Sequence, residues 1–410
     1  MPKIFKITLL TLSVALVLFA FAGYNLHSVH ADDNSAGAYR QINVYSEVLQ
    51  RIQSDYVVDP NIDAVTNGAL RGLLESLDSD SSYLTAADYK IYKAGPTGSA
   101  QVGLNVAKRF GYATVVSVLT DGPADKANLN DGDIIESIGS TSTRDIAPAM
   151  IQLMLQGQPG TPVTLSVIRP QSATPDKITL TRALVPLGAT ADSQYENNTI
   201  VELKPSTIDK ERVQEIEQRM KAMPKDGNRK ILLDLRDVAS GDVNDAVDLA
   251  NLFLSNGTIT TLEGQKYPKQ TFTADPAKAL DPSAPLVLLV NRGTSGPAEI
   301  VAAAVLDNKR GELVGEKTFG EGSLQKTFDL PDGGAIFLSI AKYASPSGKQ
   351  FETDAVTPTT MVASSSLPDA DDEEDEDEAP SAAPEPVKKA APATDDQLNK
   401  ALEILKAKTA

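Results

Sequence analysis

The chain has 410 residues, 41% of them apolar, which is enough for two or more domains with cores of their own. It has no cysteine, and its only histidines, His27 and His30, lie near the N-terminus, so disulfides, thiolate nucleophiles and histidine-dependent catalysis or zinc binding are excluded from the remainder. The net charge is −17, acidic residues crowd positions 369–378, and no basic stripe predicts binding to nucleic acid.

Residues 1–31 have the pattern of a secretory leader. Lys3 and Lys6 precede an uncharged apolar run over 7–23, and Val29-His-Ala31 then gives the small-x-small pattern of an exit site. The run is also close to the minimum length for a membrane span, so both a cleaved signal peptide and a retained anchor stay open. Either predicts export, with the rest of the chain at the periplasmic or extracytoplasmic side of the membrane.

Residues 40–95 are expected to be an N-terminal helical segment. Val44, Val48, Ile52 and Tyr56 recur at helical spacing, and further apolar residues continue the pattern up to Leu74. This segment is expected to pack on the rest of the chain or to dimerise.

Residues 98–185 contain the run Val-Gly-Leu-Asn-Val at 102–106, a strand over 113–118, a turn, short helix and strand over 122–135, an apolar helix around 147–155 and a strand over 163–168. Together they resemble a PDZ domain. The resemblance implies that Gly103, Leu104, Asn105 and Val106 bind the carboxylate of a peptide that adds a strand to the sheet. A PDZ-shaped spacer that binds nothing is the alternative.

Residues 190–362 are predicted to be an α/β domain. Apolar strands are expected over 199–203, 230–236 and 286–290, alternating with helices over 208–223, 243–254 and 297–306. Residues 363–393 are acidic and then rich in alanine and proline, which predicts a disordered linker. A short amphipathic helix is expected over 394–408, with Thr394 as its cap; docking on this subunit and docking on a partner both remain open.

The stretch 291–325 carries the strongest functional signal. It reads Asn-Arg-Gly-Thr-Ser-Gly-Pro-Ala-Glu-Ile, then an apolar helix, then Gly-Glu-Lys-Thr-Phe-Gly-Glu-Gly-Ser-Leu-Gln. This resembles the carboxyl-terminal processing peptidases, which use a serine nucleophile and a lysine base. The resemblance extends over residues 42–362 and implies a multidomain α+β protein: the helical segment, the PDZ domain, a ClpP/crotonase-like peptidase core and the acidic tail.

The side chains that would carry the chemistry are replaced. In the register that the resemblance implies, Gly296 takes the place of the serine, Glu321 that of the lysine 25 positions later, and Gln325 retains the glutamine that orients the lysine. In the loop 237–241 of the oxyanion hole Gly241 is retained, but Ser240 replaces a glycine. Ser295 and Lys317 are candidate substitutes, although a shifted nucleophile is displaced by more than catalysis tolerates.

We therefore predict an exported homologue without peptidase activity that binds unfolded or C-terminal segments of exported proteins, or that regulates a partner by forming homo- or hetero-oligomers with related subunits. No cofactor or metal is expected. An active serine-type endopeptidase with a rearranged site is the alternative hypothesis.

Overall fold

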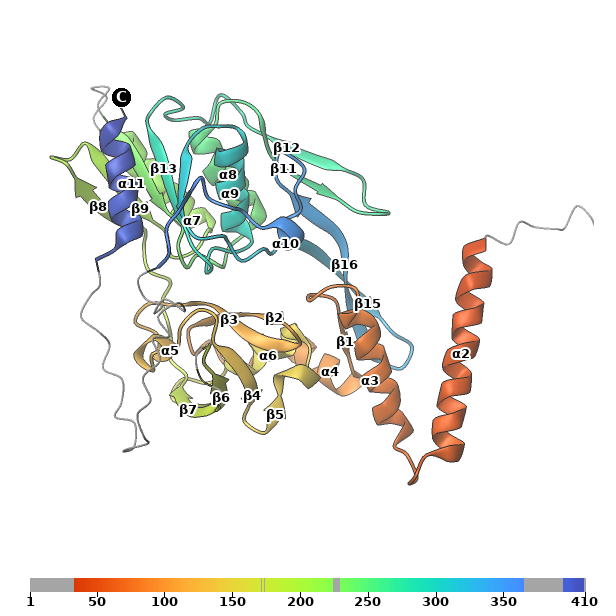
Figure 1. Ribbon diagram of the computed structural model, residues 1–410. Helices are drawn as coiled ribbons and strands as arrows, with labels where there is room; N and C mark the ends of the chain where they lie inside the picture. Colours follow the sequence, from red (N-terminus) through yellow and green to blue (C-terminus); the bar gives the residue numbers. More distant parts are fainter. Residues whose placement is uncertain (1–32, 171, 173, 224–228, 365–393, 409–410) are drawn as a thin grey trace, which may run out of the picture. The chain divides into compact units, whose positions relative to one another are not determined.

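The computed structural model describes residues 33–170, 172, 174–223, 229–364 and 394–408 (Figure 1). The predicted leader and nearly all of the predicted acidic linker lie outside them. The chain divides into two compact units, residues 1–70 and 71–410. The first contains helix α2 (Asp33–Asp55) and the start of α3 (Ile62–Glu75). Of the helices in the described ranges, none is both long and apolar enough to cross a bilayer.

The predicted helical segment 40–95 contains a strand at residues 82–84, which the sequence did not indicate. They form a short buried strand, β1 (Ser82–Leu84), which pairs antiparallel with β16 (Ala335–Ala344) in the peptidase-like domain. Helix resumes as α4 (Ala86–Ala94), whose N-terminus is capped by the Thr85 side chain. A partner strand more than 250 residues away decides this local structure, so helical periodicity could not reveal it.

The PDZ-like region is an antiparallel sheet in the order β2-β3-β4-β6-β7, with β5 beside β4 and an apolar core centred on Ile135, Leu165 and Val167. Helix α6 packs beside the edge strand β2. The elements in chain order are β2 (Leu104–Arg109), β3 (Tyr112–Val118), α5 (Pro123–Lys126), β4 (Ile134–Ile138), β5 (Thr141–Ser142), the 3-10 helix η1 (Thr143–Asp145), α6 (Pro148–Leu155), β6 (Pro162–Ile168) and β7 (Asp176–Thr181).

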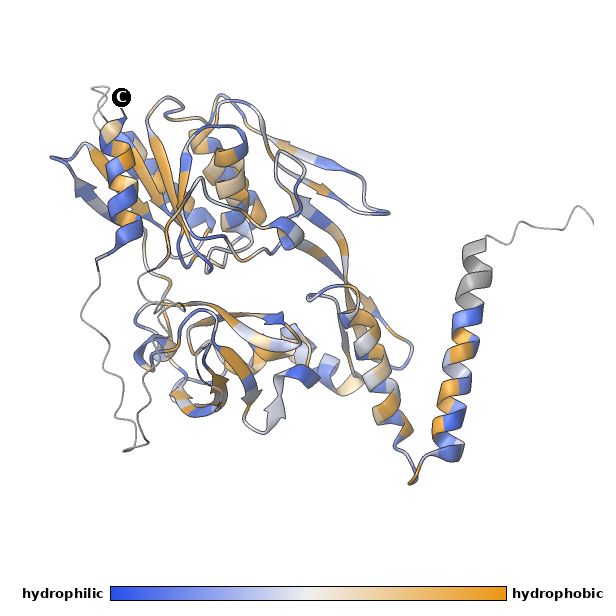
Figure 2. Ribbon diagram, viewed as in Figure 1, coloured by the Kyte–Doolittle hydropathy of each residue, from blue (hydrophilic) through white to orange (hydrophobic). Residues whose placement is uncertain are grey.

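The next domain is built on a six-stranded sheet in the order β17-β14-β13-β10-β9-β8. All neighbouring pairs are parallel except β8 with β9. Its elements are β8 (Ala191–Tyr195), β9 (Ile200–Lys204), α7 (Lys210–Ala222), β10 (Lys230–Asp234), α8 (Val243–Phe253), β13 (Leu286–Val290), α9 (Pro297–Asp307), β14 (Glu312–Gly315) and β17 (Thr360–Met361). Figure 2 shows the apolar character of the central strands and of α8 and α9, as expected for a parallel sheet covered on both faces.

A second sheet adjoins this domain and was not predicted. Strands β1, β16, β11 and β12 follow one another, and β15 pairs with β16. Its further elements are β11 (Thr258–Glu263), β12 (Gln270–Thr273), β15 (Ser323–Asp329) and the short helix α10 (Phe351–Asp354) that follows β16. Because β15 begins two residues after Glu321, this sheet fixes the path of the chain that leaves the candidate site.

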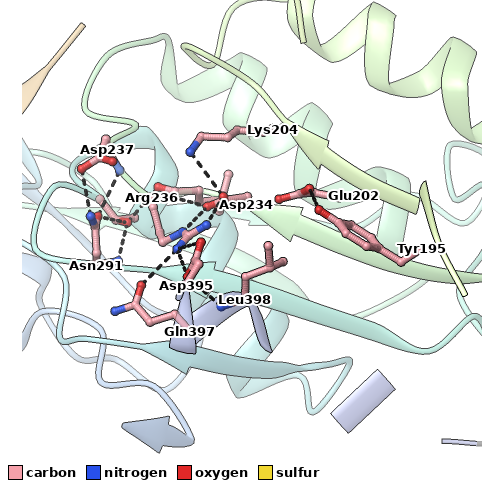
Figure 3. Close-up of polar contacts among 12 residues, drawn as sticks. Tyr195, Glu202, Lys204, Asp234, Arg236, Asp237, Asn291, Asp395, Gln397 and Leu398 are labelled. Atoms are coloured by element: carbon pink, nitrogen blue, oxygen red, sulfur yellow. Dashed lines mark hydrogen bonds and ion pairs between the residues drawn. The ribbon is translucent and has the colours of Figure 1, made fainter. Parts of the chain in front are cut away.

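The C-terminal helix α11 (Asp396–Ala407) docks on this subunit. Its Ala401 and Leu405 are fully buried against β9, β10, β13 and β14. Asp395, rather than the predicted Thr394, is the N-cap: its carboxylate accepts from the Leu398 amide at 2.9 Å and from Arg236 Nη1 at 2.9 Å (Figure 3). At the other end, Lys230 Nζ donates to the Leu405 carbonyl at 2.8 Å. The helix is therefore held at both ends and through its apolar face.

We expect Leu405→Ala to lower the free energy of unfolding by about 2–4 kcal/mol, because it leaves a cavity between α11 and the sheet. Leu184→Ala is the matched control, since Leu184 is 65% exposed, and it should cost about 0.5 kcal/mol or less. Chemical denaturation of both variants measures the difference. Equal small losses would contradict a docked α11 in solution.

Candidate active site

The candidate site lies where β13 runs into helix α9 through the turn at residues 291–296. Thr294 holds this turn, because its hydroxyl donates to the Leu235 carbonyl at the end of β10 and accepts from the Asn291 amide. Ser295 is fixed as well, by a backbone hydrogen bond from its amide to the Val238 carbonyl at 3.0 Å. A strand, a tight turn and a helix N-terminus are the arrangement in which hydrolases expose a nucleophile.

Gly296, which the resemblance places at the nucleophile position, has the strained backbone conformation that such a turn requires. Its φ is +54° and its ψ is −113°, a region that residues with a side chain rarely adopt. A Cβ atom built on Gly296 would lie 4.0 Å from Glu321 Oε2, and apart from its two chain neighbours no other described residue has an atom within that distance. The structure thus brings positions 296 and 321 together. Gly296 carries no hydroxyl, and Glu321 carries no amine.

Ser295, the candidate substitute nucleophile, donates to Glu321 Oε2 at 2.6 Å and has no exposed surface. Burial raises the pKa of Glu321, and the negative charge of Asp80 adds to the rise, while the Ser295 hydrogen bond and Arg109 oppose it. The pair is the nearest approach to a serine with a base in this site. Because the Ser295 hydroxyl is closed off from solvent, a substrate carbonyl has no access to it. Lys317, the other candidate substitute, is exposed.

The Glu299 carboxylate holds both halves of the site together. Its Oε2 accepts from the amides of Gly296 at 3.0 Å and Glu321 at 2.8 Å, and its Oε1 from the Gly320 amide at 2.9 Å and the Thr318 hydroxyl. Burial raises the pKa of Glu299 to about 7, and these four donors only partly offset that rise. One side chain therefore fixes the turn before α9 and the segment that carries Glu321.

Pro297 lacks the backbone donor that a nucleophile turn uses at this position, a feature that sequence reasoning missed. In a nucleophile turn, the amide of the residue after the nucleophile contributes to the oxyanion hole. Proline has no N–H, and the Gly296 amide is already bound by Glu299. Neither amide is available for a developing oxyanion. The signal was visible in the sequence, because the proline directly follows Gly296.

The loop 237–241, expected to supply the other oxyanion donor, is tied to its surroundings. Asp237 (φ +64°) donates its amide to Asn291 Oδ1 at 3.0 Å, and Asn291 Nδ2 returns a hydrogen bond to Asp237 Oδ1 at 2.8 Å (Figure 3). Gly241 has a φ of +146°, and a Cβ there would approach the Ile208 carbonyl oxygen to 2.2 Å. Close packing against the backbone of Ile208 is therefore sufficient to explain why position 241 holds a glycine.

Gln325 is exposed on β15, next to an irregularity in the pairing of β15 with β16. No hydrogen bond between its side chain and Glu321 is found among the described residues. The structure thus brings Gly296, Ser295 and Glu321 together and leaves Gln325 outside this group.

Asp80 and Arg109 bring opposite charges to the site. Asp80 accepts from the Ser323 hydroxyl at 2.6 Å, and burial raises its pKa despite this hydrogen bond. Arg109, at the end of β2, donates to the carbonyls of Phe319 at 2.8 Å and Gly320 at 3.1 Å. A lysine at position 321 would lie near the Asp80 carboxylate, which would keep it protonated.

The predicted peptide-binding residues lie at the start of the edge strand β2. Gly103 has a φ of +81°, Leu104 is buried, and Asn105 Nδ2 donates to Ser117 Oγ of the neighbouring strand at 2.8 Å. β2 pairs with β3 along one side only, so its other edge faces helix α6 without a partner strand among the described residues. This is the edge to which an extended peptide could add.

In the described part of the chain, no three acidic, histidine or cysteine side chains are grouped so that they could hold a metal ion.

The comparisons with known proteins agree with this architecture. Residues 200–362 match the model of peptidase family S41, and residues 114–169 match that of a PDZ domain. The chain is similar to the carboxy-terminal processing protease CtpA of Bacillus subtilis (strain 168), with 27% identity over 370 residues that cover 90% of this chain and 78% of the relative. It is also similar to the carboxyl-terminal-processing protease of Synechocystis sp., with 28% identity over 304 residues, 72% of this chain and 71% of the relative.

Among solved structures, the photosystem II D1 C-terminal processing protease aligns with a TM-score of 0.66 and 24% sequence identity. The alignment covers 79% of this chain and 88% of that one. This likeness is one of fold.

We expect Glu299 to make the protein less stable as the pH rises from 4.5 to about 7. In this interval the carboxyl is ionised in the unfolded chain but protonated in the folded one, so folding takes up a proton and the free energy of unfolding falls with pH. The loss attributable to Glu299 is about 3 kcal/mol.

Glu299→Gln cannot ionise and should show a flatter dependence by this amount, measured by chemical denaturation across the same interval. The exposed Glu403→Gln is the control and should follow the wild type. Parallel curves for the wild type and Glu299→Gln would refute the raised pKa.

Proposed function

Because the chain belongs to peptidase family S41 and contains a PDZ domain, we propose that it is a catalytically inactive carboxyl-terminal processing peptidase homologue that binds the C-termini of other proteins. One observation carries the proposal. The turn at Gly296 and the residues that position it have the geometry of a nucleophile site, while the hydroxyl, the amine and the following amide are all absent.

The chemistry follows from what each group would have to do. Acyl transfer by a serine–lysine pair needs a hydroxyl that attacks, a neutral amine that takes its proton, and N–H donors that stabilise the oxyanion. Gly296 has no attacking atom, and Glu321 already binds Ser295. Pro297 has no donor. Loss of any one of these groups would lower the rate of an enzyme. We propose that the loss of all three abolishes catalysis and leaves the binding of the peptide.

The PDZ domain accounts for the proposed binding of peptides. Strand β2 offers an unpaired edge that starts at a glycine with positive φ, which suits the addition of a peptide strand and the capture of its carboxylate. We propose that the ligands are unfolded or C-terminal segments of exported proteins. The second role that we propose for an inactive homologue is to regulate a related subunit by assembling with it.

The competing candidate, a serine peptidase acting through Ser295, rests on the 2.6 Å hydrogen bond to Glu321. We expect no labelling of the wild-type chain by a fluorophosphonate probe, since the Ser295 hydroxyl is buried. Mass spectrometry of the probe-treated protein locates any adduct. An adduct on Ser295 together with peptide cleavage would overturn the proposal of inactivity.

The structure also predicts what restores activity. We compare two variants that share Asp80→Asn, Gly296→Ser and Glu321→Lys and differ only in Pro297→Ala. Asp80→Asn removes the charge that would keep the new lysine protonated, and Pro297→Ala returns the missing amide. We expect activity from the variant with alanine, and about 10²–10³-fold less when the proline is retained. Probe labelling and cleavage of an unfolded protein measure it.

Two results would contradict these expectations. Equal activity of both variants would show that Pro297 is irrelevant to the oxyanion hole. Inert variants that remain folded would show that the site has lost more than the hydroxyl, the amine and the backbone amide described.

We further propose that the protein acts outside the cytoplasm, on the strength of the leader sequence. N-terminal sequencing of the protein recovered from the membrane and extracytoplasmic fractions distinguishes cleavage after Ala31 from a retained anchor. Recovery from the cytoplasmic fraction alone would refute export.

A further inference from the structure

Strand β15 of the second sheet has a neighbour on one side only. It pairs with β16, and among the described residues no other strand pairs with it. Its residues 325–329 are all exposed, including the aromatic side chain of Phe328 at 37%. Natural proteins usually shorten or cover such an edge, because its unpaired N–H and C=O groups can pair with another strand. The free edge of β15 is therefore a candidate interface.

The pairing with β16 determines which backbone groups of β15 point to the free edge. At the turn, the Leu330 amide donates to the Gly334 carbonyl at 2.9 Å, so Leu330 points towards β16. The register continues without a shift from residue 329 back to residue 325, and the direction of the backbone groups alternates along an antiparallel strand. Asp329, Thr327 and Gln325 therefore point away from β16, and each offers an N–H and a C=O to an added strand.

The side chains along this edge match those of a second copy of the same strand. Outward-pointing residues must face each other in an antiparallel pair, so two copies of β15 can pair with Thr327 opposite the partner's Thr327. In this register Lys326 faces the partner's Phe328, which allows a cation–π contact. Gln325 faces the partner's Asp329, which allows a hydrogen bond from its amide to the carboxylate. The two-fold axis repeats both contacts.

Other features of the edge favour the same register. Lys326 Nζ lies 5.2 Å from the centroid of the Phe328 ring in its own chain, so the two side chains share one face of the strand. A lysine and an irregularity in the pairing commonly protect a strand edge, and β15 has both. The irregularity lies between Leu324 and Gln325, before the stretch that would pair. Centring the pair on Lys326 would oppose two like charges, which is unfavourable.

We propose that β15 is the surface through which two copies of this chain associate, each strand extending the other's sheet around a two-fold axis at Thr327. The inference goes beyond the proposed binding of peptides and does not depend on it. An unfolded polypeptide is the other occupant that a free strand edge admits. An arbitrary sequence, however, lacks the matched partners for Lys326 and Gln325. The interface also gives a role to Gln325, which lies outside the group formed by Gly296, Ser295 and Glu321.

The first test removes one N–H group from the edge in the whole chain and measures association by sedimentation velocity up to ~100 μM. Thr327→Pro removes two hydrogen bonds from the dimer, one for each copy. It removes none from the pairing with β16, because the Thr327 N–H points outward, where proline is tolerated in an edge strand. We expect the wild type to form dimers, and the variant to raise the dissociation constant at least about tenfold.

Thr181→Pro is the matched control. Thr181 is an exposed residue of the edge strand β7 in the PDZ domain. The next amide, that of Arg182, donates to the Thr161 carbonyl, so the Thr181 N–H also points away from its neighbouring strand. This variant should dimerise as the wild type does.

A second set of variants tests the register. Phe328→Lys places a lysine opposite the partner's Lys326 and should weaken association at least about tenfold, because like charges that face each other repel. Combining it with Lys326→Glu places opposite charges at both contacts and should restore the dimer to within about tenfold of the wild type. Such a restoration requires that positions 326 and 328 of the two copies meet.

Every result supports or refutes the interface. A wild type that stays monomeric up to ~100 μM refutes it. So does a folded Thr327→Pro that dimerises as tightly as the wild type, because the contact would then lie elsewhere. A fluorescent unfolded polypeptide that binds a monomeric wild type, but not Thr327→Pro, would assign the edge to a polypeptide instead. The unfolding transition of each variant establishes that it is folded, and the variants at positions 326 and 328 provide the test if Thr327→Pro is not.

Discussion

The Glu299 carboxylate is the interaction on which the rest of the site depends. It stands in the first turn of α9 and is fully buried, and its two oxygens accept from four donors on two separate segments of chain. Buried carboxylates are tolerated only where donors surround them in this way. The positions of Gly296 and Glu321 are thus set by a third residue, so their side chains could change without moving the backbone.

The residues at positions 296 and 297 both lower the conformational strain of the local backbone. A side chain at a φ of +54° stores strain of about 1–3 kcal/mol, which glycine does not. Proline is favoured at the first position of a helix, where its missing N–H would have no intrahelical partner. Both changes suit the local backbone better than reactive residues would. Under the proposed inactivity, they are the changes expected from the trade-off in which active sites give up stability for function.

The sequence alone predicted those strands and helices that are determined by local residue patterns. The buried run 286–290 is the strand β13, and the predicted helices 243–254 and 297–306 differ from α8 and α9 by one residue each. The resemblance to the processing peptidases also implied that Gly296 and Glu321 meet, and the structure brings the two positions together. Local reasoning failed where distant segments decide the outcome. Strand β1 needs β16 as its partner, and the role of Glu299 appears only once residues 318–321 are folded beside α9.

The docking of α11 has a consequence for the linker that precedes it. Gln397 Nε2 donates to the Val362 carbonyl at 2.9 Å, so the chain is anchored on the same domain just before the linker and just after it. The described residues on either side of 365–393 are therefore both held on this domain. Joining two such fixed points by a chain costs only about 0.6 kcal/mol more for each doubling of the chain's length. The tether gives α11 a high effective concentration at its site on the sheet, so a helix from another molecule would have to outcompete an intramolecular one.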